Sequence, residues 1–275
     1  MNRRAPANFW GILTAGMSPA PAVISFDNVS KSYGGAAPVL DRVSLDVRER
    51  EFLAIVGPSG SGKTTLLRLV NRLIDPSAGT VRVEGQDVQS LDAVSLRRRI
   101  GYVFQGVGLF PHMTVAENIA ITPKLLDWDE TRRSARVDEL LDLVRLNRAK
   151  HRSRFPAELS GGEGQRVGVA RAIAAEPKIV LMDEPFGALD PLTRDALGED
   201  YRALHDKLGL TSVMITHDML EALLLSDRIV VIRGGRIVAD GTPQSLMSGE
   251  QDDYVRELMA TPRRQAERLR KLSAL

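Results

Sequence analysis

The chain has 275 residues, of which 43% are hydrophobic, and this is enough for one large domain or two modest ones. Lys and Arg number 37 against 35 Asp and Glu, and a formal net charge of only +2 argues against a protein that binds nucleic acid. The absence of cysteine excludes disulfides, thiolate metal sites and cysteine nucleophiles, and it fits a reducing compartment.

The N-terminal residues 1–21 carry two arginines and a short apolar patch that is broken by Gly11 and Gly16. This composition is faintly similar to a secretory signal, but the patch is too short and too interrupted for one. We therefore predict a disordered N-terminal extension, or an upstream start codon with Met17 as the working start. The longest apolar runs further along, such as 179–182, are far too short to span a bilayer.

Two kinds of strand are predicted in chain order. Residues 22–29 and 43–47 alternate apolar and polar side chains, as half-buried antiparallel strands do. The continuous apolar runs 52–56 and 179–182 are typical of strands buried on both faces of a parallel sheet that helices cover. Further strands of that sheet are predicted at 211–216 and 228–232.

Helices are predicted between these strands. A helix is predicted over 63–73, which follows a glycine-rich turn, and another over 191–208, which begins with a proline. A third is predicted over 130–146, where apolar residues recur at helical spacing. The stretch 106–160 is more helical and less strand-like than its flanks, which predicts a helical subdomain there.

A glycine-rich loop follows the first buried strand. The sequence GPSGSGKT, which begins at Gly57, fits the pattern G-x-x-x-x-G-K-[ST] and lies directly between a predicted strand and a helix. Its glycines let successive N–H groups face one point, and the helix dipole adds positive charge there, so the loop is suited to phosphate. Lys63 can reach the outer phosphates and the Thr64 hydroxyl can bind Mg²⁺. The alternative is a flexible Gly/Ser loop without a ligand. The position of the loop between a strand and a helix argues against it.

Two carboxylates follow the second buried strand. Asp183 is placed at the strand end to hold Mg²⁺, usually through water, and Glu184 lies one residue further, where it can polarise an attacking water. The alternative is an acidic turn before Pro185, for which one carboxylate would suffice.

The segment LSGGEGQRV combines a helix start with a possible anion site. Ser160 is followed three residues later by Glu163, which predicts a capping box. Gly161 and Gly162 allow close backbone approach, and the helix N-terminus offers partial positive charge. Gly164 costs the helix about 1 kcal/mol relative to alanine. A well-capped helix without a ligand is the alternative.

These motifs, together with YVFQ ending at Gln105, GALD ending at Asp190 and ITHD containing His217, resemble the ATP-binding subunits of ABC transporters. The resemblance runs over about residues 22–242. It implies an α/β fold, namely a P-loop NTPase of the ABC ATPase type with a mainly parallel core sheet, an antiparallel β subdomain and a helical subdomain. It also implies an ATPase whose hydrolysis of ATP is coupled to transmembrane transport.

The resemblance further implies a head-to-tail pair of chains that sandwiches two ATP molecules, each between one copy's phosphate loop and the other copy's LSGGE segment. Glu184, His217 and Gln105 are the implied catalytic residues, and Gln105 would sense Mg²⁺ and the attacking water. The implied metal ligands are Thr64, Gln105 and Asp183. The implied nucleotide contacts are Tyr33, Gly57, Pro58, Ser59, Gly60, Ser61, Gly62, Lys63, Thr64, Thr65, Ser160, Gly161, Gly162, Glu163 and Asp190. Tyr33 would stack on adenine and Asp190 would lie where the two copies touch.

Glu163 stands at a position where the family commonly has glutamine. Its negative charge, expected near the ribose, predicts a working segment with slightly weaker affinity for the ATP that it contacts in trans.

The region after Gln105 forms, in ABC importers, a groove that receives a coupling helix of the membrane subunit. This implies that a permease docks near residues 105–128, and the apolar Leu109, Phe110 and Met113 suit such a contact. For each of these three residues, packing within the helical subdomain is the alternative.

Two stretches, GLFPHMTVAENI and PKLLDW, are most similar to importers of quaternary-amine osmoprotectants such as glycine betaine, choline, carnitine or proline betaine. This predicts an importer subunit at the cytoplasmic face of the inner or plasma membrane, bound peripherally through its permease, with a substrate-binding protein in the complex and no nucleic acid. Another cargo (an amino acid, a lipid or an exported compound) and, less favoured, a soluble ABC ATPase are the alternatives.

The tail, residues 243–275, is predicted to be a basic helical segment. Val255, Leu258 and Met259 fall on one face, and Pro262 is expected to break the helix. Many subunits of the osmoprotectant subgroup continue into a tandem pair of regulatory CBS domains, for which the tail leaves no room, so osmotic regulation is expected to lie elsewhere.

Overall fold

The computed structural model describes residues 22–35, 37–248 and 252–273, and the extension predicted for residues 1–21 lies outside this part of the chain. The strands are β1 (Ala22–Lys31), β2 (Leu40–Arg48), β3 (Phe52–Val56), β4 (Ala78–Val83), β5 (Gln86–Asp87), β6 (Ile100–Val103), β7 (Ile179–Asp183), β8 (Thr211–Thr216), β9 (Arg228–Arg233) and β10 (Arg236–Gly241). The α-helices are α1 (Lys63–Val70), α2 (Ala93–Arg99), α3 (Val115–Leu125), α4 (Glu130–Leu143), α5 (Arg148–His151), α6 (Gly161–Ile173), α7 (Pro191–Leu208), α8 (Met219–Leu225), α9 (Pro243–Ser248) and α10 (Asp253–Ser273). Short 3-10 turns lie at Val88–Ser90 and Pro156–Glu158.

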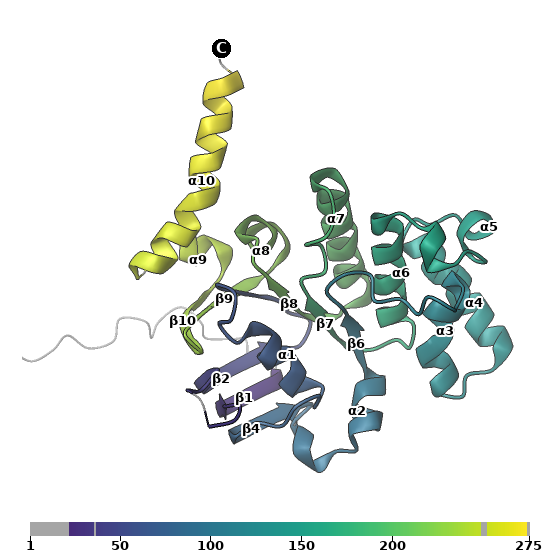
Figure 1. Cartoon of the computed structure of the whole chain (residues 1–275), viewed down its shortest axis with the longest axis horizontal. Coiled ribbons are helices and arrows are strands. Elements are labelled where there is room, and N and C mark those ends of the chain that lie inside the picture. The colour runs from purple at the N-terminus through teal and green to yellow at the C-terminus, as the bar shows by residue number, and fades with distance from the viewer. Residues whose placement is uncertain (1–21, 36, 249–251, 274–275) are drawn as a thin grey trace, which may run out of the picture.

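A six-stranded sheet in the order β10-β9-β3-β8-β7-β6 forms the centre of the molecule (Figure 1). Its strands are parallel except for β10, which pairs antiparallel with β9. The prediction that 52–56 is buried on both faces is confirmed: Phe52 and Ala54 belong to one hydrophobic core, and Leu53 and Ile55 to the other. Helices cover both faces of such a parallel sheet, which explains why these strands carry no polar alternation.

A second, antiparallel sheet in the order β2-β1-β4-β5 contains the two predicted alternating segments. β1 pairs with β2 and with β4, and its inward side chains Ile24, Phe26 and Val29 are buried. Figure 1 shows α1 between the two sheets, and its apolar residues complete the core that the sheets share. The predicted fold, a mainly parallel core sheet with an antiparallel β part and a helical part, is confirmed.

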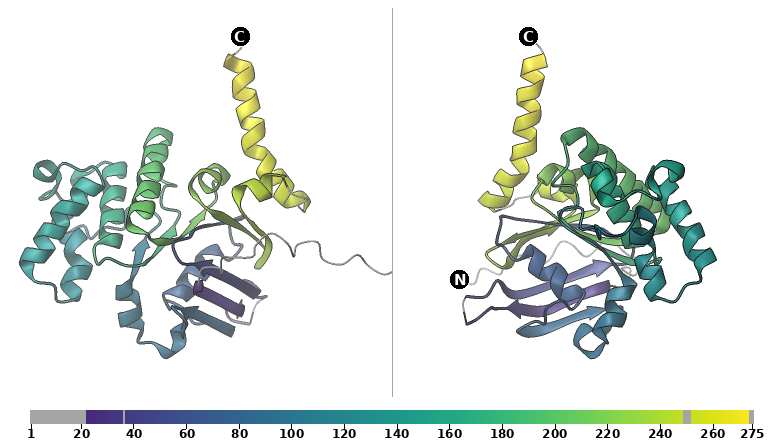
Figure 2. Two further views of the ribbon diagram at one scale, coloured as in Figure 1. Left: turned by 180° about the vertical axis from the view of Figure 1, so that it is seen from behind. Right: turned by 45° about the vertical axis from the view of Figure 1, so that its right-hand side comes forward.

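The helices α3 to α6 form a group at one side of the central sheet, whereas α10 projects at the opposite side (Figure 2). α3, α4 and α5 fall within 106–160, and α6 packs on both α3 and α4. Local sequence explains several helix starts. Thr114 and Glu117 form a capping box at α3, and Asp190 caps α7 ahead of a proline in its first turn.

The predicted break at Pro262 is wrong, because α10 continues through it from Asp253 to Ser273. Val255 and Met259 are buried against the body and hold the preceding turns in place. A proline removes one backbone hydrogen bond and need not end a helix whose turns are formed on both sides. Within the described ranges, no helix combines the length and the apolar character that a membrane span requires.

Candidate functional site

The predicted phosphate loop connects β3 to α1, as the sequence indicated. Two of its glycines are required by close packing. A Cβ on Gly57 would lie 2.1 Å from the backbone oxygen of Ile232, and a Cβ on Gly62, whose φ is +101°, would lie 2.6 Å from Cδ2 of Leu40. The loop therefore packs closely against β9 and β2, and a side chain at either glycine would clash with these strands. Pro58, Ser59 and Gly60 form its exposed tip.

Lys63 and Ser61 are buried beneath this loop. The Lys63 ammonium donates to the backbone oxygens of Gly57 (2.8 Å) and Pro58 (3.0 Å). Burial lowers the pKa of Lys63, and the negative charges of Glu184 and Asp183 oppose that shift. The Ser61 hydroxyl is buried without a hydrogen-bond partner in the described structure. A buried cation and an unpaired buried hydroxyl beside a helix N-terminus suit the oxygens of a phosphate.

Thr64 and Asp183 meet at the start of α1. The Thr64 hydroxyl donates to Oδ1 of Asp183 over 3.2 Å, and Thr65 follows in the first turn of the helix. Asp183 ends β7, and its burial raises the pKa of the carboxyl, while the Thr64 hydrogen bond acts in the opposite direction. The phenol of Tyr102 on β6 lies close enough that the Asp183 charge helps burial to raise the Tyr102 pKa.

Glu184, Gln105 and His217 converge although three different strands carry them. Oε2 of Glu184 accepts a hydrogen bond from Nε2 of Gln105 (3.0 Å) and lies 3.4 Å from Nδ1 of His217. Glu184 has a left-handed φ of 46°, and its amide donates to Ile215 on β8 over 3.0 Å. A non-glycine residue in that conformation is strained, and strain of this kind clusters at functional sites.

The LSGGE segment lies with the helical group, apart from α1 (Figure 1). The predicted capping box is confirmed: the Ser160 hydroxyl accepts from the Glu163 amide (3.3 Å), and Oε2 of Glu163 accepts from the Ser160 amide (2.9 Å). Ser160 and Gly161 are exposed at the helix start, whereas a Cβ on Gly162 would lie 2.5 Å from Cγ2 of Thr193 on α7. Within the described residues, this segment therefore packs on α7.

Asp190 and Tyr33 are both exposed. Oδ1 of Asp190 accepts from the amide of Thr193 (3.1 Å), and this helix cap lowers the Asp190 pKa. Tyr33 lies after β1 with 46% of its surface exposed, and the Lys31 ammonium is 5.1 Å from its ring centroid. Both side chains are free to meet a further molecule on one side.

Several residues of the site were missed at the sequence level. Tyr102 lies beside Asp183, His151 bonds to Glu163 over 2.9 Å, and Val107 packs against Gly164. The Arg171 guanidinium donates to the backbone oxygen of Gly108 over 2.8 Å. Although Tyr102 belongs to the YVFQ motif, its contact with Asp183 could not be foreseen, and the same holds for the other three residues, because each contacts a residue on another element.

The geometry agrees with a family assignment. A family model described as ABC transporter matches residues 40–187. The choline transport ATP-binding protein OpuBA of Bacillus subtilis is 48% identical over 241 residues, which cover 88% of this chain and 63% of OpuBA. The glycine betaine uptake system ATP-binding protein YehX of Escherichia coli is 46% identical over 235 residues, which cover 86% of this chain and 76% of YehX. The chain belongs to the ABC transporter family.

Solved structures lead to the same family. The dimeric ATP-binding cassette MJ0796, in a post-hydrolysis state bound to ADP and Pi, has a TM-score of 0.72 and 33% sequence identity, and the match covers 80% of this chain and 98% of that one. The chain spans less than two thirds of the length of OpuBA, with 63% covered.

Proposed function

We propose that the chain binds and hydrolyses ATP as the ATP-binding subunit of an ABC importer. The convergence of Gln105 and His217 on one carboxylate oxygen of Glu184, next to the phosphate loop, is the observation that carries this proposal. Segments that are far apart in the sequence supply six parts of a phosphoryl-transfer site. These are an ammonium and a hydroxyl at the start of α1, two carboxylates at the end of β7 and directly after it, and one side chain after each of β6 and β8.

In this proposal the loop amides and Lys63 hold the outer phosphates, and the Lys63 ammonium exchanges the carbonyls of Gly57 and Pro58 for phosphate oxygens. Glu184 accepts a proton from the attacking water as general base. Gln105 donates to Oε2 of Glu184 and so orients that carboxylate, while the exposed His217 reaches toward the γ-phosphate. Tyr33 stacks on the adenine.

Mg²⁺ fits the donors that are present. Among the described residues there is no cluster of three His, Cys, Asp or Glu side chains that could hold a metal by itself. Mg²⁺ in nucleotide sites needs only one or two protein oxygens, because phosphates and waters complete its shell. Thr64 and Asp183 are placed to supply these oxygens, with Gln105 nearby. The bound ion would neutralise charge on the transferred phosphoryl group.

The second half of each site comes, in this proposal, from a second copy of the chain. Ser160 and Gly161 are exposed at the start of α6, and Asp190 caps the start of α7, so both helix starts can face another copy. The dimeric state of the cassette MJ0796 supports this arrangement.

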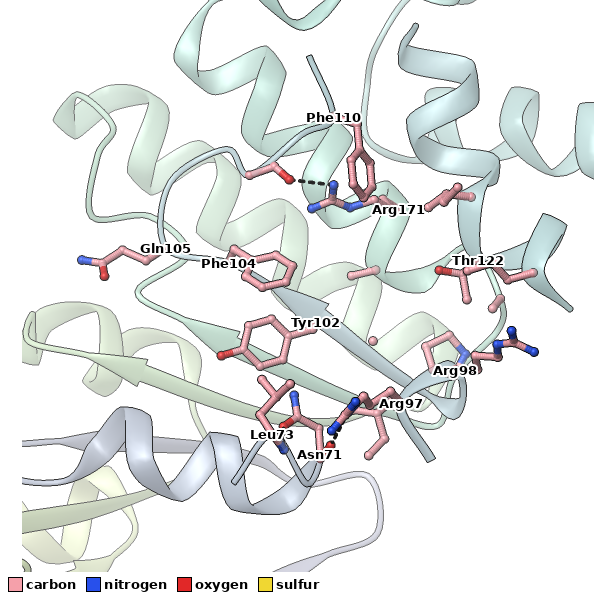
Figure 3. A pocket seen from close by; sticks show the side chains of 18 residues that line it. Asn71, Leu73, Arg97, Arg98, Tyr102, Phe104, Gln105, Phe110, Thr122 and Arg171 are labelled. Atoms are coloured by element: carbon pink, nitrogen blue, oxygen red, sulfur yellow. Dashed lines mark hydrogen bonds between the residues drawn. The ribbon is translucent and has the colours of Figure 1, made fainter. Parts of the chain in front are cut away.

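A cavity of about 600 Å³ beside β6 supports permease docking near residues 105–128 (Figure 3). Phe104 and Phe110 line it with 47% and 41% of their surfaces exposed, and Leu125 also belongs to its lining. Figure 3 shows Gln105 pointing away from the rings of Tyr102 and Phe104, so a helix seated here would contact the backbone that carries the catalytic glutamine. Of the three apolar residues that sequence favoured for this contact, Leu109 instead packs against the core and Met113 lies by a neighbouring hollow.

The cargo that we propose is a quaternary-amine osmoprotectant, because OpuBA and YehX are named for choline and glycine betaine uptake. The chain would then lie at the cytoplasmic face of the membrane, attached through its permease, in a complex with an extracytoplasmic substrate-binding protein.

Purification of the native complex tests this proposal. We expect to identify a membrane subunit and a protein that binds glycine betaine or choline. In vesicles that contain the complex, the same solute should stimulate ATP hydrolysis. A lipid-binding partner, or hydrolysis that responds only to another solute, would overturn the cargo. A protein that neither binds nor hydrolyses ATP would overturn the ATPase assignment as well.

A further inference from the structure

His151, the last residue of α5, has its ring between two hydrogen-bond acceptors. Nδ1 lies 2.8 Å from the backbone oxygen of Asn147, and Nε2 lies 2.9 Å from Oε1 of Glu163. The side chain is only 6% exposed. Water therefore has little access to either ring nitrogen, and the two protein oxygens must satisfy the ring.

Both oxygens can only accept a hydrogen bond. A backbone carbonyl has no proton to give, and Glu163 is ionised at neutral pH, because hydrogen bonds from the Ser160 backbone and then from His151 lower its pKa to about 2. A neutral imidazole carries one N–H and would leave a lone pair facing an oxygen at hydrogen-bond distance. Only the imidazolium donates to both partners.

We propose that His151 is a positioning residue that, as the imidazolium, fixes the LSGGE segment for contact with the nucleotide of a second chain. The connection runs through one carboxylate. Oε1 of Glu163 accepts from His151, and Oε2 accepts from the Ser160 amide at 2.9 Å. The ring therefore holds the carboxylate that orients Ser160. This role rests on the ATPase function proposed above, whereas the charge state of the ring does not.

The other charged groups around this pair are lysine, arginine and aspartate side chains. Lys150 lies 3.8 Å from Oε1 of Glu163 but is 54% exposed. Other charges on the neighbouring helices are engaged in ion pairs: Arg148 with Asp142, Arg152 with Asp138, and Arg166 with Asp200. Histidine is the side chain that changes charge between about pH 5 and 8. A pH response of the segment in that window therefore points to His151.

The KM for ATP should rise with pH. The contact is complete at low pH and is lost as the ring releases a proton with rising pH, because one of its two hydrogen bonds then disappears. Loss of one hydrogen bond that fixes a ligand-contacting segment corresponds to a roughly threefold to tenfold rise in KM for ATP between about pH 6 and 8.5.

An isosteric substitution of the acceptor gives a sharp test. In Glu163→Gln the amide oxygen can still accept from the Ser160 amide, and the amide NH₂ can donate to the lone pair of a neutral ring. We expect the rise in KM with pH to be lost or strongly reduced in this variant. Both proteins carry the same His217, so the difference between the two profiles isolates His151.

The matched control is Glu158→Gln. Oε2 of Glu158 accepts from the Phe155 amide over 2.7 Å, as Oε2 of Glu163 accepts from the Ser160 amide, and the contacts described for Glu158 include no histidine. We expect this variant to keep the wild-type pH profile. A profile that flattens equally in both variants would overturn the proposal, because it would show a general effect of removing a carboxylate near this helix.

The charge state is measured independently of ATP by ¹H–¹⁵N NMR of the imidazole. At pH 6.5 we expect both ring nitrogens of His151 to carry protons in the wild type. A singly protonated ring at that pH, or a Glu163→Gln variant with the wild-type KM profile, would overturn the proposal. A doubly protonated ring in a protein that does not hydrolyse ATP would instead overturn the proposed function and, with it, the positioning role.

Discussion

Gly164→Ala should destabilise the protein although alanine is the better helix former. The helix itself would gain about 1 kcal/mol from this change. The new Cβ, however, would lie 2.8 Å from Cγ1 and 3.2 Å from Cγ2 of Val107, well inside the 3.5–4.0 Å of an ordinary carbon contact. Overpacking of this kind costs about 1–3 kcal/mol. We therefore expect a net loss of about 1 kcal/mol in the free energy of unfolding.

The sign should reverse when Val107 is shortened. In a Val107→Ala background both Cγ atoms are gone, and the nearest remaining atom is Cβ of residue 107 at 3.6 Å, an ordinary contact. Gly164→Ala should then stabilise by about 1 kcal/mol, so the coupling between the two positions is about 2 kcal/mol.

Urea denaturation of the four proteins of this cycle measures the coupling from the midpoints at constant m-value. Because Val107 follows Gln105 by two residues, the ATPase rate should fall in Gly164→Ala and recover in the double variant. Equal stabilisation by Gly164→Ala in both backgrounds would refute the argument, since it would show that Val107 moves aside at no cost.

Three further predictions concern charged and titrating groups. Glu184→Gln should lower kcat by at least about a hundredfold while ATP binding persists and the dimer is trapped, as size-exclusion chromatography with ATP would detect; near-normal turnover would disprove the general-base role. Lys63→Ala should weaken ATP binding itself by about tenfold or more, measured by calorimetry, and unchanged affinity would contradict the phosphate contact. Burial and then the positive charge of Arg202 lower the pKa of His205, so protonation is favoured in the unfolded chain, and the free energy of unfolding should fall as the pH drops below about 6.5. His205→Asn should reduce that pH dependence in urea titrations at pH 7.5 and 5.5.

Predictions from local sequence succeeded where the local chain controls the outcome. The helix 191–208 was predicted with its observed limits, because Asp190 caps its start, Pro191 pre-sets its first turn and Gly209 ends it with a left-handed φ of +61°. The strand 211–216 likewise matched. The helix predicted to end at residue 146 stops at Leu143, because Arg145 adopts a left-handed φ of 57°. Nothing in the local sequence predicted that conformation.

The surroundings of Glu163 could not be predicted from the sequence near it. Its position in a capping box was evident from the spacing to Ser160, and so was the presence of a negative charge beside the expected nucleotide. The structure adds His151 at 2.9 Å and Lys150 at 3.8 Å from the same carboxylate oxygen. Positive charge from another helix therefore faces that oxygen, and the weaker trans affinity expected from the charge stays a prediction.

The sequence by itself determined the features whose geometry is local: the glycine-rich loop between a strand and a helix, the helix caps, and two carboxylates at the end of a buried strand. Their order along the chain was also enough to indicate the family. Only the tertiary structure decided which side chains meet. Gln105 and Glu184 are 79 residues apart, yet they bond over 3.0 Å because β6 and β7 are adjacent in the sheet, and β8 brings His217 to the same edge. Parallel strands present their carboxyl ends together, so the order of strands, which no short motif encodes, assembles the site.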